Sequence, residues 1–334
     1  MIGIECCLCT FGPLERRGLC SYTSWASTDC QWIQMRNKEL KYIHDKGYAR
    51  QDPDQLPRKR ALVLDWLFEV CDFYCLQRQT AYLAQDYLDR YLMVQDRIDC
   101  SSMQLLGVTA LFIAAKKEEV YPPKINAFAY VTDGACEVWE IERTEMKMLK
   151  ALKWNLCPET PISWLNLFVQ IEAEQSEENF LDPFFSQETY LEITQLLDLS
   201  ILDINSLDFT YSTLASAAIC HFSSYNLVHR ITGISWESIA TCYLWMSTFM
   251  DMLRYSPKPQ LKTFSKVKPS SSHNIQTHNI THDMLRNAQE NKSYISTLQM
   301  SPLGLGGLLS PPSRTEKFFP YTIEFDLMAT FSDD

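Results

Sequence analysis

The stretch of residues 101–123 carries the most continuous apolar pattern in the chain. Nearly every position between Leu105 and Ala115 is apolar, and a helix that is apolar around its whole circumference is buried on all sides. Ser101 with Gln104 three residues later forms a capping-box start, and two prolines form a stop. Because the run is shorter than a membrane span and ends in charged residues, we predict a core helix surrounded by other helices.

Helical periodicity on both sides of this stretch predicts an all-α fold. Segments with this period and short connections indicate a five-helix bundle, and they comprise residues 58–75, 79–93, 101–120, 125–131 and 135–152. The pattern then begins again and predicts helices at residues 161–174, 186–204, 208–225 and 235–253. The alanine-rich centre of the third resembles the stretch 101–123, so we expect a second bundle of the same kind.

The ends of the chain differ from the two bundles. Residues 1–24 show no periodicity and are expected to be disordered, whereas residues 25–54 are expected to hold an N-terminal helix spanning 25–48. The first bundle is then expected at 55–157 and the second at 158–256. Residues 257–334 are expected to contain one helix, at 274–291, and a flexible tail that can be phosphorylated.

The composition narrows the classes of function. The net charge is −11, and residues from 257 onward hold 8 basic and 7 acidic side chains, which leaves −12 for residues 1–256. This acidic balance disfavours nucleic acid as a partner, and no secretory signal or membrane span is expected. The 12 cysteines show no repeated pair spacing, which favours reduced thiols in the cytosol or nucleus over disulfides.

Catalytic and metal-binding motifs are not evident. The sequence holds no glycine-rich nucleotide loop, no Gly-x-Ser-x-Gly and no His-Glu-x-x-His. We therefore expect no enzyme, no catalytic residue and no cofactor. A metal site at Cys6, Cys7 and Cys9, or at the histidines of the segment 273–282, is the less favoured alternative because no second ligand cluster accompanies either group.

Two sets of residues point to partner binding. One helical stripe on the segment 58–75 consists of Lys59, Leu62, Val63, Trp66 and Glu69, and it predicts either an exposed groove wall or a core-facing side. Four charges lie on otherwise apolar helices, namely Arg60, Asp89, Lys116 and Glu145. These are either surface charges or groups that need a specific partner, because an unpaired buried charge is costly.

Several motifs resemble the cyclin box, in the order and close to the spacing of that family. They are KRALVLDWL at 59–67, YLDRY at 87–91, AKKEEVYPP at 115–123 and YVTD at 130–133. ALKW at 151–154, SWLN at 163–166 and HNIQTH at 273–278 look like E-type members in particular. The resemblance covers roughly residues 25–290 and implies two tandem five-helix cyclin-box bundles.

This resemblance implies a regulatory subunit that binds and activates a cyclin-dependent serine/threonine kinase at the G1/S transition. By position, Lys116 and Glu145 are expected to hydrogen-bond the kinase around its mobile regulatory helix. The walls of the pocket for an apolar kinase side chain are expected to be Ile113, Leu149 and Leu156. Lys117 stands where the family usually has a large apolar side chain, which predicts weaker kinase binding. Arg60 and Asp89 resemble the family's internal, structural ion pair.

The same resemblance gives the stripe on 58–75 a role. It implies a hydrophobic groove that docks Arg-x-Leu motifs of substrates and inhibitors. The groove residues are expected to be Lys59, Leu62, Val63, Trp66, Glu69, Met103 and Gln104. Lys59 replaces a methionine of the family, which predicts a weaker contact at that position.

The tail carries proline-directed phosphorylation sites at Ser301 and Ser310. The sequence around Ser310 resembles the phosphodegron that hands E-type cyclins to a ubiquitin ligase, although a serine replaces the usual threonine. Nuclear localisation is expected from the resemblance. The alternatives are a cyclin-fold scaffold of the transcription-factor type and a divergent cyclin that does not activate its kinase.

Overall fold

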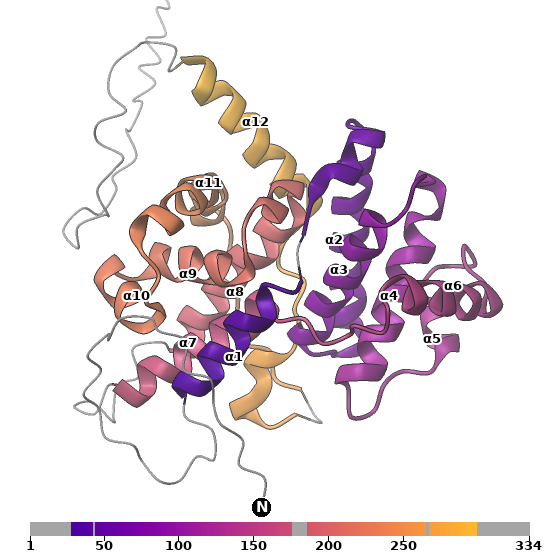
Figure 1. The fold of residues 1–334 in the computed structure, drawn as a ribbon, viewed down its shortest axis with the longest axis horizontal. Coiled ribbons are helices and arrows are strands. Elements are labelled where there is room, and N and C mark those ends of the chain that lie inside the picture. The colour runs from indigo at the N-terminus through magenta and orange to yellow at the C-terminus, as the bar shows by residue number, and fades with distance from the viewer. Residues whose placement is uncertain (1–27, 43, 176–185, 265–266, 299–334) are drawn as a thin grey trace, which may run out of the picture.

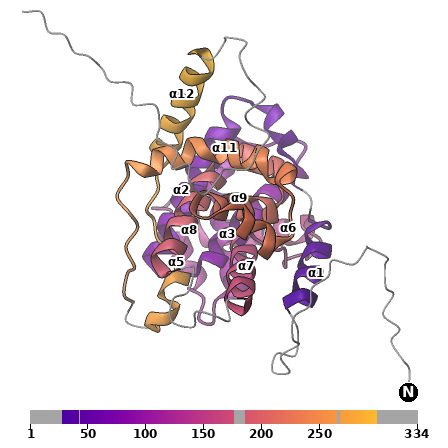
Figure 2. The same cartoon turned by 90° about the vertical axis from the view of Figure 1, so that its left-hand side faces the viewer.

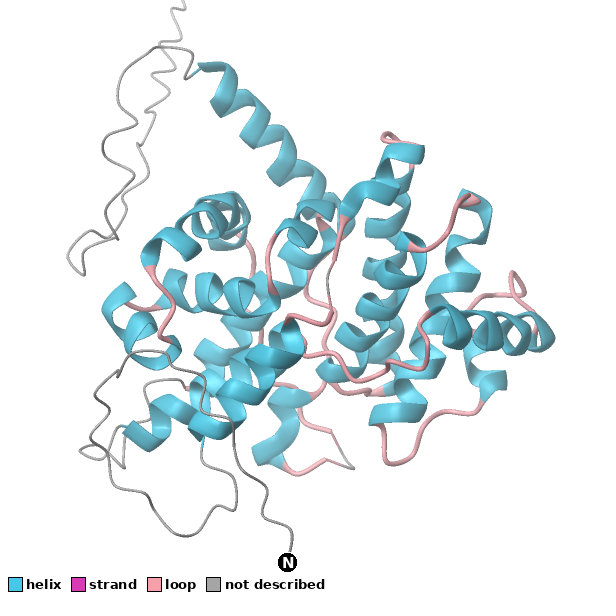
Figure 3. Cartoon of the chain, in the orientation of Figure 1, coloured by secondary structure: helices cyan, strands magenta, loops and turns pink. Residues whose placement is uncertain are grey.

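The computed structural model describes residues 28–42, 44–175, 186–264 and 267–298. The regular elements of these ranges are helices, together with one isolated bridge between Gln77 and Ile275 (Figures 1 and 3). Within the same ranges, no helix is both long and apolar enough to cross a membrane. The all-α prediction is confirmed.

The first bundle consists of α2 (Leu56–Tyr74), α3 (Arg78–Met93), α4 (Met103–Glu118), α5 (Ile125–Tyr130) and α6 (Val138–Ala151). Helix α4 is the stretch with the continuous apolar pattern, and every residue from Leu106 to Ala115 is buried. It packs against α2, α3, α5 and α6. Its predicted capping box is wrong, because Asp99 instead caps the preceding 3-10 turn by accepting a 2.9 Å bond from the amide of Ser101.

The second bundle repeats the arrangement with α7 (Pro161–Gln175), α8 (Gln187–Leu202), α9 (Tyr211–Phe222), α10 (Tyr225–Thr232) and α11 (Trp236–Arg254). The alanine-rich α9 is its central helix and packs on α7, α8, α10 and α11. Helix α10 was not predicted. A serine cap, Ser224, and a left-handed glycine, Gly233, mark its ends.

The chain before the first bundle departs from its prediction. Helix α1 (Thr28–Glu39) ends well before Tyr48, and a separate 3-10 helix, η1 (Lys46–Gln51), follows it. The break is encoded locally, because the carboxylate of Asp45 accepts a 2.9 Å bond from the amide of Gly47 and starts the new turn. Helix α1 packs against α7, so the N-terminal segment lies on the second bundle (Figure 1).

The chain after the second bundle crosses to the first bundle and returns. Figure 2 shows the connection from α11 running along one side of the molecule to a 3-10 helix, η4 (Pro269–Asn274), and back to α12 (His282–Leu298). The predicted helix at 274–291 therefore begins too early. Residues 275–281 are extended, and the amide of Gln276 donates to the carbonyl of Leu76 over 2.9 Å. We call residues 255–281 the strap.

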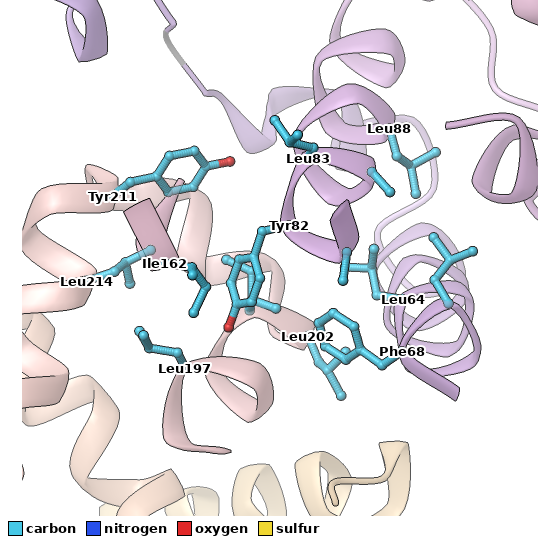
Figure 4. Close-up of a cluster of buried hydrophobic side chains, with 14 of the residues drawn as sticks. Leu64, Phe68, Tyr82, Leu83, Leu88, Ile162, Leu197, Leu202, Tyr211 and Leu214 are labelled. Atoms are coloured by element: carbon cyan, nitrogen blue, oxygen red, sulfur yellow. The ribbon is translucent and has the colours of Figure 1, made fainter. Parts of the chain in front are cut away.

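One apolar core runs through both bundles. Figure 4 shows Leu64, Phe68 and Tyr82 of the first bundle facing Ile162, Leu197 and Leu202 of the second. These side chains are at most 2% exposed. Because fully buried apolar side chains each contribute about 1.5–3 kcal/mol, this shared core holds the two bundles in one orientation.

Candidate functional site

The C-terminal end of α4 and the middle of α6 form a charged corner on the first bundle. The Lys116 ammonium and the Glu145 carboxylate form an ion pair across the two helices. The ammonium also lies 4.1 Å from the centre of the Phe112 ring, a cation–π contact. Lys116 keeps 41% and Glu145 keeps 15% of the side chain exposed, so both charges are accessible to a partner.

The residues predicted as pocket walls are buried or half-buried, and Ile113 and Leu149 belong to the same two helices, α4 and α6. Ile113 is 2% and Leu149 is 5% exposed, and Leu156 is half-buried against the same core. Lys117 is exposed beside the corner and pairs with Glu118 at 3.1 Å.

The predicted groove residues divide into a surface row and a floor. Leu62 is 39% exposed, Trp66 is half-buried, and Lys59 and Glu69 are exposed on the same side of α2. Val63 is 8% and Met103 is 1% exposed, which places these two in the floor, and Gln104 is half-buried beside them. The stripe is thus exposed at Lys59, Leu62 and Glu69 and core-facing at Val63, and the groove stays a prediction.

A glycine allows α4 to approach α2 closely. A Cβ atom built on Gly107 of α4 would lie 2.4 Å from Cγ1 of Val63 on α2. Real Cβ contacts are longer than this, so only glycine permits the observed approach of α4 to α2. The spacing of α2 and α4 therefore depends on this position.

Arg60 and Asp89 form a buried ion pair with no exposed surface on either side chain. Arg60 Nε lies 2.6 Å from Asp89 Oδ1, and Nη2 lies 2.8 Å from Oδ2. Burial alone would raise the pKa of Asp89, but the Arg60 charge and its hydrogen bonds outweigh this and hold that pKa below its ordinary value. The pair is bidentate and dry, which suits a structural role.

The remaining N–H groups of Arg60 reach the second bundle. Nη1 donates to the carbonyls of Ile201 and Leu202 at 2.9 and 3.1 Å. These are carbonyls at the C-terminus of α8, where the helix dipole favours a cation. Tyr48 completes the site by donating to Asp89 over 2.9 Å. The pair therefore joins the N-terminal segment and both bundles.

A second buried network was not found from the sequence. Arg78 at the start of α3 pairs with Asp198 of α8 at 3.1 Å, and both are almost fully buried. Asp198 also accepts from Tyr82 over 2.7 Å and from Gln276 of the strap over 2.9 Å. Burial raises the pKa of Asp198 although Arg78 opposes the rise. The only sequence signal is that Arg78 and Asp198 each lie in a helical segment with many apolar residues.

The three histidines near the C-terminus have structural contacts. His278 Nε2 lies 2.7 Å from Asp65 Oδ1, and this hydrogen bond raises the pKa of His278. The amide of His282 donates to the other oxygen of Asp65, and the carbonyl of His273 accepts from Arg78. No group of three or more metal-ligand side chains occurs within the described ranges. Ser301, Ser310 and residues 1–24 lie outside those ranges.

Comparison with known protein families gives two matches that together span most of the chain. Residues 31–157 match the cyclin N-terminal domain, and residues 159–281 match the cyclin C-terminal domain. Among solved structures, a viral cyclin from herpesvirus saimiri is similar with a TM-score of 0.53 over 65% of this chain and 96% of that one. At 15% identity, this likeness concerns the fold alone.

Sequences similar to this chain indicate which type of cyclin it resembles. Rat G1/S-specific cyclin-E1 is 43% identical over 294 residues, which cover 88% of this chain and 72% of the rat protein. The sea urchin Hemicentrotus pulcherrimus has a G1/S-specific cyclin-E that is 40% identical over 298 residues, or 88% and 70% of the two chains. With these sequence matches and both domain models, the chain belongs to the cyclin family and is similar to E-type cyclins over most of its length.

Proposed function

We propose that this chain is the regulatory subunit of a cyclin-dependent kinase and acts at the G1/S transition. The similar G1/S-specific cyclins support the timing and the class of partner. The observation that carries the proposal is the corner of α4 and α6, where Lys116 and Glu145 stand paired and accessible above buried Ile113 and Leu149. This arrangement offers a partner helix two hydrogen-bonding charges.

Activation follows from differential binding. A kinase holds its phosphates and metal correctly only when its strand lysine pairs with the glutamate of its regulatory helix. A partner that binds only the inward position of that helix increases the population of the active state. In this mechanism the chain contributes no catalytic group.

A histone kinase assay tests this function. Purified cyclin-dependent kinase is mixed with the parent chain, with Lys116→Ala/Glu145→Ala, or with Lys46→Ala/Asp208→Ala as a control that removes another exposed ion pair. We expect the parent and the control to activate the kinase and the corner variant to lose most of that activity. Binding without activation by the parent would instead indicate a non-activating cyclin, and no binding would refute the proposal.

We further propose that the α2 groove docks Arg-x-Leu motifs of substrates and inhibitors. Exposed Leu62 and half-buried Trp66 offer apolar surface for the leucine, and Glu69 offers a charge for the arginine. An Arg-x-Leu peptide should bind the parent and lose most of its affinity for Trp66→Ala. Leu244→Ala removes an exposed leucine of the second bundle and serves as the control. Equal affinity for parent and Trp66→Ala would exclude docking here.

From the resemblance to E-type cyclins, we also propose that the tail is a phosphorylated degradation signal and that the protein resides in the nucleus. Phosphorylation of Ser301 and Ser310 would add charge that an arginine cluster of a ubiquitin ligase can bind. Ser310→Ala should lengthen the half-life of the protein in dividing cells, with Ser301→Ala as the comparison. An unchanged half-life of both variants would remove the degron from the proposal. Fluorescence imaging of the tagged chain tests its residence in the nucleus.

A further inference from the structure

A notch lies where the start of α2, the end of α8 and the start of α12 meet (Figure 1). Its volume is about 500 Å³, which is within the range of sites that enclose a small ligand or several side chains of a peptide. It lies outside the α4–α6 corner, and none of the residues predicted for the docking groove lines it. We call it the junction notch.

The floor of the junction notch is apolar. Half-buried Pro57 and Ile204 line it, together with buried side chains of all three helices, namely Ala61, Leu202 and Leu285. Apolar surface of this kind favours an aliphatic side chain, because both surfaces are removed from water when they meet. A ligand that uses the whole site therefore has an apolar part.

Two arginines of the junction notch carry its positive charge. Arg58 of α2 and Arg286 of α12 both line it and are exposed. Within the described ranges the Arg58 guanidinium has no hydrogen bond or ion pair. Arg286 pairs with Asp283 at 3.1 Å on its own helix, and exposed pairs of this kind contribute little. Both guanidinium groups are therefore available to an anion.

Two carboxylates of the junction notch restrict which anion fits. Asp203 is buried and accepts hydrogen bonds from the side-chain amides of Asn205 and Gln289 over 2.8 and 3.2 Å. Asp54 is exposed and repels a nearby anion. An anion must therefore gain more from the two arginines than it loses to Asp54. A phosphate does so best, because it carries about −1.5 to −2 charges and accepts paired bonds from arginine.

We propose that the junction notch binds the tail of the same chain when Ser310 is phosphorylated, an inference that rests on the proposed phosphorylation of this residue. Leu308 and Leu309 directly precede Ser310. The tail thus carries apolar side chains beside a phosphate, as the notch carries an apolar floor beside two arginines. Bound in this way, the phosphate is withheld from any partner that recognises it.

The length of the chain permits this contact. Arg286 lies 12 residues before Leu298, where α12 ends, and this corresponds to about 18 Å along a helix axis. Ser310 lies 12 residues beyond Leu298, and an extended chain of that length spans up to about 40 Å. A tether of this size gives an effective concentration of about 1 mM, at which a weak contact suffices.

Fluorescence anisotropy tests the proposal with the full, unphosphorylated chain and a labelled peptide of residues 304–314 that carries phosphoserine at 310. We expect the peptide without phosphate to bind about tenfold more weakly. Arg58→Ala/Arg286→Ala in the chain, or Leu308→Ala/Leu309→Ala in the peptide, should each weaken binding by about tenfold. The control Arg97→Ala/Arg230→Ala removes two exposed arginines elsewhere and should stay within about twofold of the parent.

A second measurement tests whether the tail of the same chain is the occupant. The full chain with phosphoserine at 310 should bind the labelled phosphopeptide about tenfold more weakly than the unphosphorylated chain, because its own tail competes. This loss should be the same at every protein concentration. Equal affinities would exclude the tail as the occupant, and a loss that grows with concentration would mean that a second copy binds instead.

Two further results would overturn the proposal, namely a phosphopeptide that does not bind the parent, or equal losses in the two arginine variants. Nonspecific attraction is disfavoured, because the net charge of the chain is −11. Since the peptide receives its phosphate in synthesis, an unchanged half-life of Ser310→Ala in cells leaves these measurements unaffected. Thermal unfolding of each variant verifies its fold.

Discussion

At the scale of the residue, the charges on apolar helices carry the clearest information. The sequence singles out Arg60 and Asp89 because such charges need compensation, and the structure places them 2.6 Å apart. It cannot single out Arg78 and Asp198 in the same way. Their pairing depends on how α3 and α8 of different bundles are brought together, and a pattern that repeats within one helix carries no information about that.

Arg60→Ala should be among the most destabilising single substitutions in the chain. It leaves the Asp89 carboxylate buried without its counter-charge, which costs about 3–5 kcal/mol. Arg60→Lys should recover only part of this loss, because an ammonium cannot bind Asp89 in two places and also reach the Ile201 carbonyl. Urea denaturation measures both, and full stability of the lysine variant would contradict the bidentate role.

Lys117→Leu should increase kinase affinity. The substitution places apolar surface beside the α4–α6 corner and breaks only an exposed pair with Glu118, which contributes little. Titration calorimetry with the kinase measures the change, and Lys124→Leu, an exposed lysine before α5, is the matched control. Equal affinities of Lys117→Leu and the parent would show that Lys117 does not weaken the contact.

His221 should make stability depend on pH. Removal from water lowers the pKa of His221 to about 4, against a weaker opposite effect of its bond to the Tyr243 carbonyl. The unfolded chain takes up this proton at about pH 6.5. The free energy of unfolding should therefore fall as the pH falls from about 6.5 to about 4, and it should be constant above that window with respect to this group.

His221→Phe keeps a ring against Tyr243 and removes the titration. Between about pH 7 and about pH 5 the parent should lose unfolding free energy relative to the variant, as measured by urea denaturation. A difference that does not change with pH would show that His221 does not make stability fall at low pH. His278 cannot mimic the effect, because its raised pKa gives a contribution that is lost as the pH rises.

At the scale of the element, the long helices and the short α5 were predicted, whereas the short α10 was missed. The period of 3.6 residues is visible over α2 or α4, but the eight residues of α10 show little of it. The prediction of one helix over residues 25–48 was wrong for a different reason. Apolar positions continue past Glu39, but a capped 3-10 turn at Asp45 ends the helical path, and such local hydrogen bonds can override periodicity.

The approach of α2 to α4 makes Gly107 a sensitive position for the proposed docking groove. Gly107→Ala should destabilise the chain by about 1–3 kcal/mol, because the new methyl group collides with Val63. Arg-x-Leu peptide affinity should fall with it. The double variant Gly107→Ala/Val63→Ala makes room for the methyl group and should recover part of the stability in urea denaturation. Loss of the same size in both variants would place the strain elsewhere.

At the scale of the whole molecule, two buried polar networks join the bundles. Asp198→Ala should cost about 3–5 kcal/mol, because Arg78 is left buried without a counter-charge. Its partners lie on α3 and the strap, so hydrogen exchange should accelerate in both bundles and not only in α8. Asp208→Asn, which breaks an exposed pair, should change stability by less than about 1 kcal/mol. Faster exchange confined to α8 would contradict a shared network.

The strap has a consequence for synthesis of the chain on the ribosome. Arg78 belongs to the first bundle, but its acceptors include the carbonyl of His273 and the hydroxyl of Thr277. Domains generally fold in order as they emerge. Here a buried arginine of the first bundle obtains its last partners only after the second bundle has been translated. A nascent chain that stalls between the bundles therefore has an incomplete core, with the Arg78 guanidinium still lacking these acceptors.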